Sequence, residues 1–250
     1  MACLGASASL LIAGCSGAGS SPHAAASSAA ASAAAAPASP TEQELTGTQL
    51  AAGLPPLSAY GAGLVESQGD PRDSGGSLNP QRNISVTQQS CWQLVHGNLG
   101  SISDSYAVDS VHESDAAANA SLFVTVGLTQ FPAGMGSGIF DEYTTALARC
   151  PSYSVAPTTG PTKGSTDSGS IATAPVTGLG DKALRTDYTE SFKLSLPAVG
   201  TALAHDSRTL DALYGDVEIE ITATSYSRTV TENYDLTSLV KQIAAKLKLS

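Results

Sequence analysis

The most constraining feature of this 250-residue chain is residues 217–222, which read Val-Glu-Ile-Glu-Ile-Thr and alternate strictly between apolar and polar side chains. Because successive side chains of a β-strand point to opposite faces, the apolar residues share one face and Glu218 and Glu220 share the other. This pattern is typical of an antiparallel sheet that is buried on one face and solvated on the other. Gly215-Asp216, directly before the segment, fits a hairpin turn. We therefore interpret Glu218 and Glu220 as part of a solvated face.

Other segments predict the rest of the domain. Residues 122–131 alternate like a strand, and residues 67–81, rich in Gly, Pro, Asp and Ser, predict an exposed loop. Residues 139–150 place apolar side chains at helical spacing, with Cys150 on the apolar stripe. Asp235 can cap a final amphipathic helix. The predicted fold class is α+β: an antiparallel β-sheet with helices packed on one face, following a disordered N-terminal tether.

The N-terminal residues have the form of a lipoprotein export signal. Residues 11–15 read Leu-Ile-Ala-Gly-Cys, a lipobox of two aliphatic residues, two small residues and a cysteine. Cleavage would remove residues 1–14 as a signal peptide and leave Cys15 to carry acyl chains. Since two acyl chains anchor a protein stably, we expect lipidated Cys15 to hold the protein on the outer face of the cytoplasmic membrane. The alternative is an ordinary Ala/Gly/Ser-rich leader with a chance cysteine.

The next segment predicts a spacer. From Ser16 to Pro40 the chain is almost entirely Ala, Ser, Gly and Pro and has no charged residue. Such a composition cannot bury enough apolar surface to offset the entropy of ordering. We expect residues 15–43 to be a disordered tether, and residues 44–250 to form one extracellular sensor-like α+β domain.

The four cysteines predict one disulfide. Cys3 leaves with the signal peptide and Cys15 is acylated, so Cys91 and Cys150 remain. In an oxidising exterior these two residues are expected to pair. The alternative is two free buried thiols.

No motif identifies a reaction. His205-Asp206 would pair a base with an orienting acid, but no activated nucleophile lies nearby in the sequence. His112 with Glu113 and Asp115 would make a metal cluster, yet no histidine belongs to a ligand-spaced group. A net charge of −10 with scattered basic residues argues against a nucleic-acid partner. We assign no catalytic, cofactor-binding or metal-binding residue, and we expect that the protein is not an enzyme and needs no cofactor.

Several short motifs carry a family resemblance. They are residues 45–50 (Leu-Thr-Gly-Thr-Gln-Leu), Cys91, residues 148–153 (Ala-Arg-Cys-Pro-Ser-Tyr), residues 178–181 (Gly-Leu-Gly-Asp) and residues 239–247. With the lipobox and the tether, they resemble actinobacterial lipoproteins that carry a sensor domain like the extracellular domain of the mycobacterial kinase PknH. The resemblance implies a helix-decorated antiparallel sheet with a large cleft for an unidentified ligand of the cell envelope. The kinase domain carries two disulfides, whereas here only Cys91 and Cys150 remain.

Three functions follow as hypotheses. The first is a membrane-anchored extracellular binding module, non-catalytic, whose ligand is a small or lipidic molecule of the cell envelope. The second is a protein-interaction or structural lipoprotein that docks on an envelope protein. The third is an envelope hydrolase, which would have to use His96, His112 or His205.

Overall fold

The computed structural model describes residues 44–66, 73–78, 91, 94, 103–113, 122–156, 165–193, 202–226 and 228–250. All of these residues lie within the unit Glu42–Ser250. The expected signal peptide, Cys15 and the expected tether lie outside the described residues. None of the helices in the described ranges is long and apolar enough to cross a membrane.

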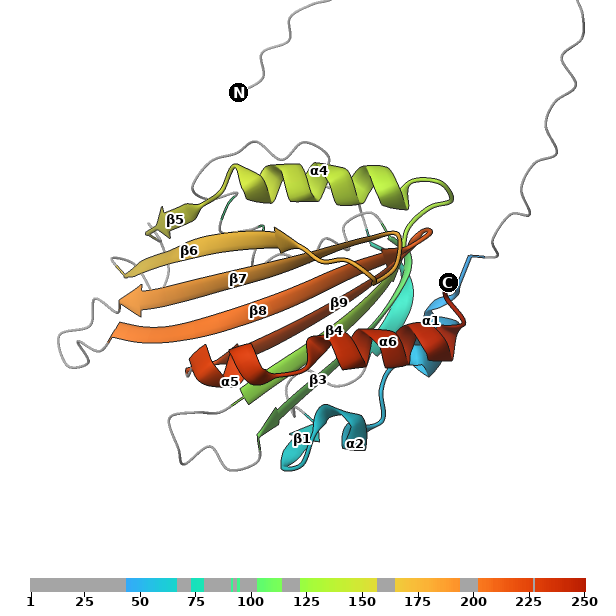
Figure 1. The fold of residues 1–250 in the computed structure, drawn as a ribbon, viewed down its shortest axis with the longest axis horizontal. Coiled ribbons are helices and arrows are strands. Elements are labelled where there is room, and N and C mark those ends of the chain that lie inside the picture. The colour runs from blue at the N-terminus through green and yellow to red at the C-terminus, as the bar shows by residue number, and fades with distance from the viewer. Residues whose placement is uncertain are drawn as a thin grey trace, which may run out of the picture. The chain divides into compact units, whose positions relative to one another are not determined.

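An antiparallel sheet of nine strands organises these residues (Figure 1). The strands are β1 (Leu64–Glu66), β2 (Asp73–Leu78), β3 (Ser103–Glu113), β4 (Leu122–Gln130), β5 (Ser152–Val155), β6 (Thr166–Pro175), β7 (Lys182–Lys193), β8 (Ala202–Tyr214) and β9 (Val217–Ser225). Eight of them follow the order β1-β3-β4-β9-β8-β7-β6-β5, and β2 also pairs with β3. The expected strand over 122–131 is confirmed as β4. The expected loop over 67–81 is wrong in part, because β2 lies within it and pairs with β3 despite its Gly-rich sequence.

Five helices accompany the sheet in the described ranges. They are α1 (Gly47–Gly53), α2 (Leu57–Tyr60), α4 (Gly136–Ala148), α5 (Arg228–Asn233) and α6 (Leu236–Leu247). α6 is the expected final helix, and the Asp235 carboxylate accepts a hydrogen bond of 2.9 Å from the backbone N–H of Ser238 at its start. α4 begins at Gly136, earlier than the expected Ile139, and ends at Ala148.

One face of the sheet is apolar and packs against α1 and α6. On β9 this face carries Val217, Ile219, Ile221 and Ala223, all buried. The apolar side chains of β4 and of α6 belong to the same core. In Figure 1, α5 and α6 lie in front of the sheet. This arrangement agrees with the predicted α+β class and the predicted antiparallel sheet.

Part of the opposite face is covered as well, by α4. Ala212 and Leu213 are neighbours on β8, so their side chains point to opposite faces. Ala212 lies in the α1/α6 core, whereas Leu213 packs in a second core with Phe140 and Leu147 of α4. The expectation that helices pack on one face therefore holds for α1 and α6 and is wrong for α4. The reason is that α4 has an apolar stripe of its own, which it buries on this side. We call the sheet surface on this side the α4 face.

Candidate functional site

The expected disulfide ties Cys150, two residues after the end of α4, to a distant part of the chain. Cys91 and Cys150 are joined, with their Cα atoms 5.5 Å apart and a sequence separation of 59. Both residues are buried in the core that contains the apolar side chains of α4. The bridge therefore restrains the end of α4 against the segment that carries Cys91. Cys15, the expected lipidation site, lies outside the described residues.

The histidines do not form the pairs that would suggest catalysis. His205 pairs with Glu190 at 2.7 Å, while Asp206 accepts a hydrogen bond of 2.7 Å from the Thr189 hydroxyl. His205 and Asp206 are consecutive strand residues, so their side chains point to opposite faces and do not act as a base with its orienting acid. Glu190 also accepts a hydrogen bond of 2.8 Å from the Tyr153 hydroxyl.

His112 lies beside an aromatic ring. It stacks on Phe123 with ring centroids 6.0 Å apart. Of the metal cluster considered from the sequence, Asp115 lies outside the described residues. Within the described ranges, no three acidic, histidine or cysteine side chains are placed to hold a metal ion.

Hydroxyl side chains form a row across the α4 face. Ser110, Thr125, Thr222, Thr209, Thr186 and Thr173 are successive register partners on β3, β4, β9, β8, β7 and β6. The hydroxyl oxygens of Thr209 and Thr222 are 2.9 Å apart and hydrogen bonded. A sheet face that only packs against a helix would be apolar, like the opposite face here. On the α4 face, the row instead presents hydroxyl groups that can donate and accept hydrogen bonds.

Three carboxyl groups lie next to this row on the α4 face. We call Asp211, Glu218 and Glu220 the acidic cluster. Asp211 and Glu220 are direct cross-strand partners on β8 and β9, and Glu218 lies two residues before Glu220 on the same face. Asp211 is 0 % exposed and Glu218 is 2 % exposed, while Glu220 is half-buried. The interpretation of Glu218 as a solvated residue is therefore wrong, because the second core under α4 continues over this part of the sheet.

Burial and mutual repulsion hold these carboxyl groups towards their protonated forms. Burial is the main cause that raises the pKa of Glu218 to about 8, and the Glu220 charge adds to it. Burial also raises the pKa of Asp211, followed by the charges of Glu220 and Glu218. Tyr143 of α4 faces the same cluster, since burial and then the charges of Asp211, Glu220 and Glu218 raise its pKa. Groups with pKa values shifted this far are concentrated at functional sites.

The acidic cluster lacks hydrogen-bond donors. Both carboxyl oxygens of Asp211 and one carboxyl oxygen of Glu218 are buried without a hydrogen-bond partner, and so is the Thr186 hydroxyl. Lys182 lies on β7, but its ammonium group binds Ser137 and, at 2.6 Å, Asp141. Buried polar atoms are rarely left unpaired, so each such group calls for an explanation.

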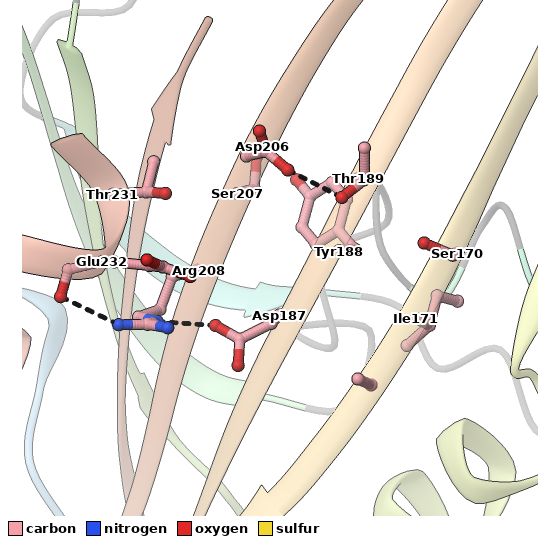
Figure 2. Close-up of a pocket in the computed structure, with 11 residues that line it drawn as sticks. Ser170, Ile171, Asp187, Tyr188, Thr189, Asp206, Ser207, Arg208, Thr231 and Glu232 are labelled. Atoms are coloured by element: carbon pink, nitrogen blue, oxygen red, sulfur yellow. Dashed lines mark hydrogen bonds and ion pairs between the residues drawn. The ribbon is translucent and has the colours of Figure 1, made fainter. Parts of the chain in front are cut away.

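A separate pocket lies against β6, β7, β8 and α5, and its charged groups bind one another (Figure 2). It has a volume of about 150 Å³. Arg208 donates to Asp187 at 2.6 Å and to the backbone carbonyl of Glu232 at 3.0 Å, and Thr189 donates to Asp206. A ligand would have to displace these bonds. The acidic cluster, whose oxygens are unpaired, is therefore the stronger candidate site.

Sequence reasoning missed the acidic cluster, although one signal for it was present. Glu218 and Glu220 were noticed, but Asp211 was not, because it belongs to another strand. Residues 209–214 read Thr-Leu-Asp-Ala-Leu-Tyr, a largely apolar run that contains one carboxylate. A lone acid within such a run indicates burial on both faces of a strand.

The comparisons with known proteins agree with this fold. No family model matches the chain, and no curated protein matches it. Among solved structures, the chain is similar to the extracellular domain of PknH from Mycobacterium tuberculosis. The two share a fold. The TM-score is 0.50 at 14 % sequence identity, and the match covers 82 % of this chain and 98 % of the PknH domain. The resemblance expected from the sequence motifs is thus confirmed at the level of the fold.

Proposed function

We propose that this chain is a lipid-anchored extracellular binding protein whose non-catalytic domain holds a small polar ligand of the cell envelope on the α4 face. The fold likeness to a domain known to be extracellular supports the location. The lipobox supports attachment through Cys15, and as a coil the tether would reach roughly 30 Å from the membrane. The anchor and the tether together would present the domain to molecules of the envelope.

The contrast between the two faces of β9 carries the binding proposal. One face presents Val217, Ile219, Ile221 and Ala223, and the other presents Glu218, Glu220, Thr222 and Thr224. Solvent reaches the half-buried Glu220, Thr222 and Thr224, but it does not account for Glu218, which is almost fully buried. Burial of polar groups is costly unless partners satisfy them. A polar ligand would supply such partners, and this favours a polar ligand over a lipidic one.

The state of the histidines supports a non-catalytic role. The His205 ring is engaged by Glu190, and His112 stacks on a partly exposed phenylalanine. His205 is thus engaged by a carboxylate rather than by a serine or cysteine, and His96 lies outside the described residues. This supports binding over hydrolysis of envelope material.

The proposal is tested by comparing the native and denatured masses of the exported protein. The full chain is expressed with its leader, extracted in mild detergent, and measured by mass spectrometry under native and denaturing conditions. We expect extra mass under native conditions that is lost on denaturation. Thr209→Val with Thr222→Val should abolish the extra mass, because it removes two hydroxyl groups from the α4 face. The fold should survive, since the double change removes both members of one hydrogen bond and keeps the side-chain shape.

The matched control is Thr177→Val, an exposed threonine in the turn before β7. It should retain the extra mass. No extra mass in the wild type, or equal extra mass in the double variant, would contradict binding on the α4 face.

A further inference from the structure

The acidic cluster and its neighbour Thr186 present four buried oxygen atoms without hydrogen-bond partners. They are the two carboxyl oxygens of Asp211, one of Glu218, and the hydroxyl of Thr186. Thr186 is 2 % exposed and lies on β7, two residues from Leu184, which is the register partner of Asp211. Its hydroxyl group, which can both donate and accept, has no partner either, so the unpaired polar groups extend beyond the carboxyl groups. Protonation of one carboxyl group supplies a single O–H donor, which is fewer than the unpaired oxygen atoms of the cluster.

The cluster also lacks a positive charge. Burial and the neighbouring carboxylates raise the pKa values of Asp211 and Glu218, and no lysine, arginine or histidine contributes to these shifts. The nearest candidate on the same face of β7, Lys182, is engaged by Asp141 and Ser137. Like charges directly opposite each other in an antiparallel pair destabilise the sheet. Asp211 opposite Glu220 therefore costs stability whenever both carboxyl groups are ionised.

We propose that the acidic cluster binds the ammonium group of a small organic amine, an assignment that rests on the proposed function and names the chemical class of its ligand. An ammonium group carries three N–H donors and one positive charge, which match the acceptor oxygens and the charge of Asp211 and Glu218. A metal ion fits less well, since no three acidic, histidine or cysteine side chains are placed to coordinate one in the described ranges.

Gly127 marks the approach to the cluster. It is the register partner of Glu220 on β4, and a Cβ atom built there would meet only the Glu220 Cβ within 4 Å, at 3.8 Å. Gly127 and Glu220 are half-buried, whereas Asp211 is fully buried. The sheet surface next to Glu220 therefore carries no side chain at Gly127 and is partly open to solvent. The amine would enter over Gly127 and place its ammonium group towards Asp211.

Binding of an ammonium group would be linked to proton release. The titratable groups that face the cluster are Tyr143 from α4, Tyr188 from β7, Asp211 from β8, and Glu218 and Glu220 from β9. Burial keeps protons on the carboxyl groups of the free protein, and a cation would displace them. The affinity should therefore rise with pH towards the pKa of Glu218, about 8.

The test uses methylamine and 1,4-diaminobutane as probes, with butane-1,4-diol as the uncharged match. Each is titrated calorimetrically into the full chain after extensive dialysis, in two buffers of different ionisation enthalpy. We expect saturable binding of the amines with proton release, and none of the diol. Asp211→Asn and, separately, Glu218→Gln should weaken binding roughly tenfold to a hundredfold, as for one charge-assisted hydrogen bond. Glu142→Gln, an exposed neighbour of Tyr143 on α4, should bind like the wild type.

The outcomes separate this proposal from the proposed function. No saturable binding of either amine, or equal binding in wild type, Asp211→Asn and Glu218→Gln with all three folded, overturns the ammonium assignment. If the exported protein still releases a neutral molecule that is lost with Thr209→Val and Thr222→Val, the proposed function stands without the ammonium assignment. If there is neither a captured molecule nor amine binding, both proposals fail.

Discussion

Asp211 on β8 lies directly opposite Glu220 on β9, and both carboxyl groups face α4 rather than the apolar core under α6. Directly opposed residues of an antiparallel pair have Cβ atoms about 5 Å apart, so the two charges cannot both form without strong repulsion. Glu218 lies on the same face of β9 and is almost fully buried. Burial, and after it repulsion between the carboxyl groups, raises the pKa values of Asp211 and Glu218, and burial raises the pKa of Glu220.

The first prediction concerns pH and Glu218. Its pKa is about 8 in the folded protein against 4.5 without the fold. Between these values the folded state holds a proton that the unfolded state has released, so the free energy of unfolding falls as pH rises towards 8 and then levels off. Glu218→Gln removes this effect. We expect nearly unchanged stability at pH 5 and a gain on the order of 3–4 kcal/mol at pH 8, relative to wild type.

Chemical denaturation at both pH values measures this difference. Glu142→Gln is the control, because Glu142 is exposed on the same helix. A Glu218→Gln variant whose stability follows the wild-type pH profile would show that Glu218 is ionised in the folded state.

The disulfide gives the second prediction. Cys91→Ser should lower the free energy of unfolding by roughly 2–4 kcal/mol, because the bridge no longer restricts the unfolded chain. Cys150 is buried, so its thiol should react with an alkylating reagent only after unfolding. Unfolded, unreduced wild-type protein should show no alkylation at Cys91 or Cys150. Alkylation of both residues there would mean that the bridge does not form.

Two glycines before β7 give the third prediction, as a matched pair. Gly178 and Gly180 both have positive φ, +79° and +52°. A Cβ at Gly178 meets nothing within 4 Å, whereas a Cβ at Gly180 would lie 2.2 Å from the backbone oxygen of Leu213. Gly178→Ala should therefore cost about 1 kcal/mol from backbone strain alone. Gly180→Ala should cost a further 1–3 kcal/mol, roughly, because β7 and β8 must separate.

Thermal or denaturant unfolding of the two variants checks this order. Equal losses would indicate that the turn shifts to accommodate either side chain.

The fourth prediction concerns the anchor. Cys15→Ser should move the protein from the membrane fraction to the soluble exported fraction, because the acyl chains are lost. Ser16→Ala, next to it, should leave the protein in the membrane fraction. Retention of Cys15→Ser in the membranes would contradict the lipobox.

Much of the fold could be predicted from local pattern. The alternation of β9, the strand β4 and the cap of α6 are all set by neighbours in sequence, and each was correctly predicted. β2 was missed because Gly75 and Gly76 have no strand preference of their own, and only the pairing with β3 makes them a strand. The second covered face was missed because α4 and β9 are far apart in sequence.

The candidate site was harder to predict for the same reason. Glu218 and Glu220 alternate with apolar residues, a pattern that normally indicates solvent. Only the register of β8 against β9 brings Asp211 opposite Glu220, and the second core, which includes α4, buries Asp211 and Glu218. A single sequence contains neither relationship. The disulfide, in contrast, followed from counting cysteines.

Hydrogen exchange would test the central claim, ligand binding on the α4 face, most directly. The exported protein is compared with the same protein after unfolding, dialysis and refolding, which removes a captured ligand. The account predicts that the exported form is better protected in α4 and in β9, with α5 unchanged. Equal exchange in the two forms, or protection confined to α5 beside the Arg208–Asp187 pocket, would contradict it.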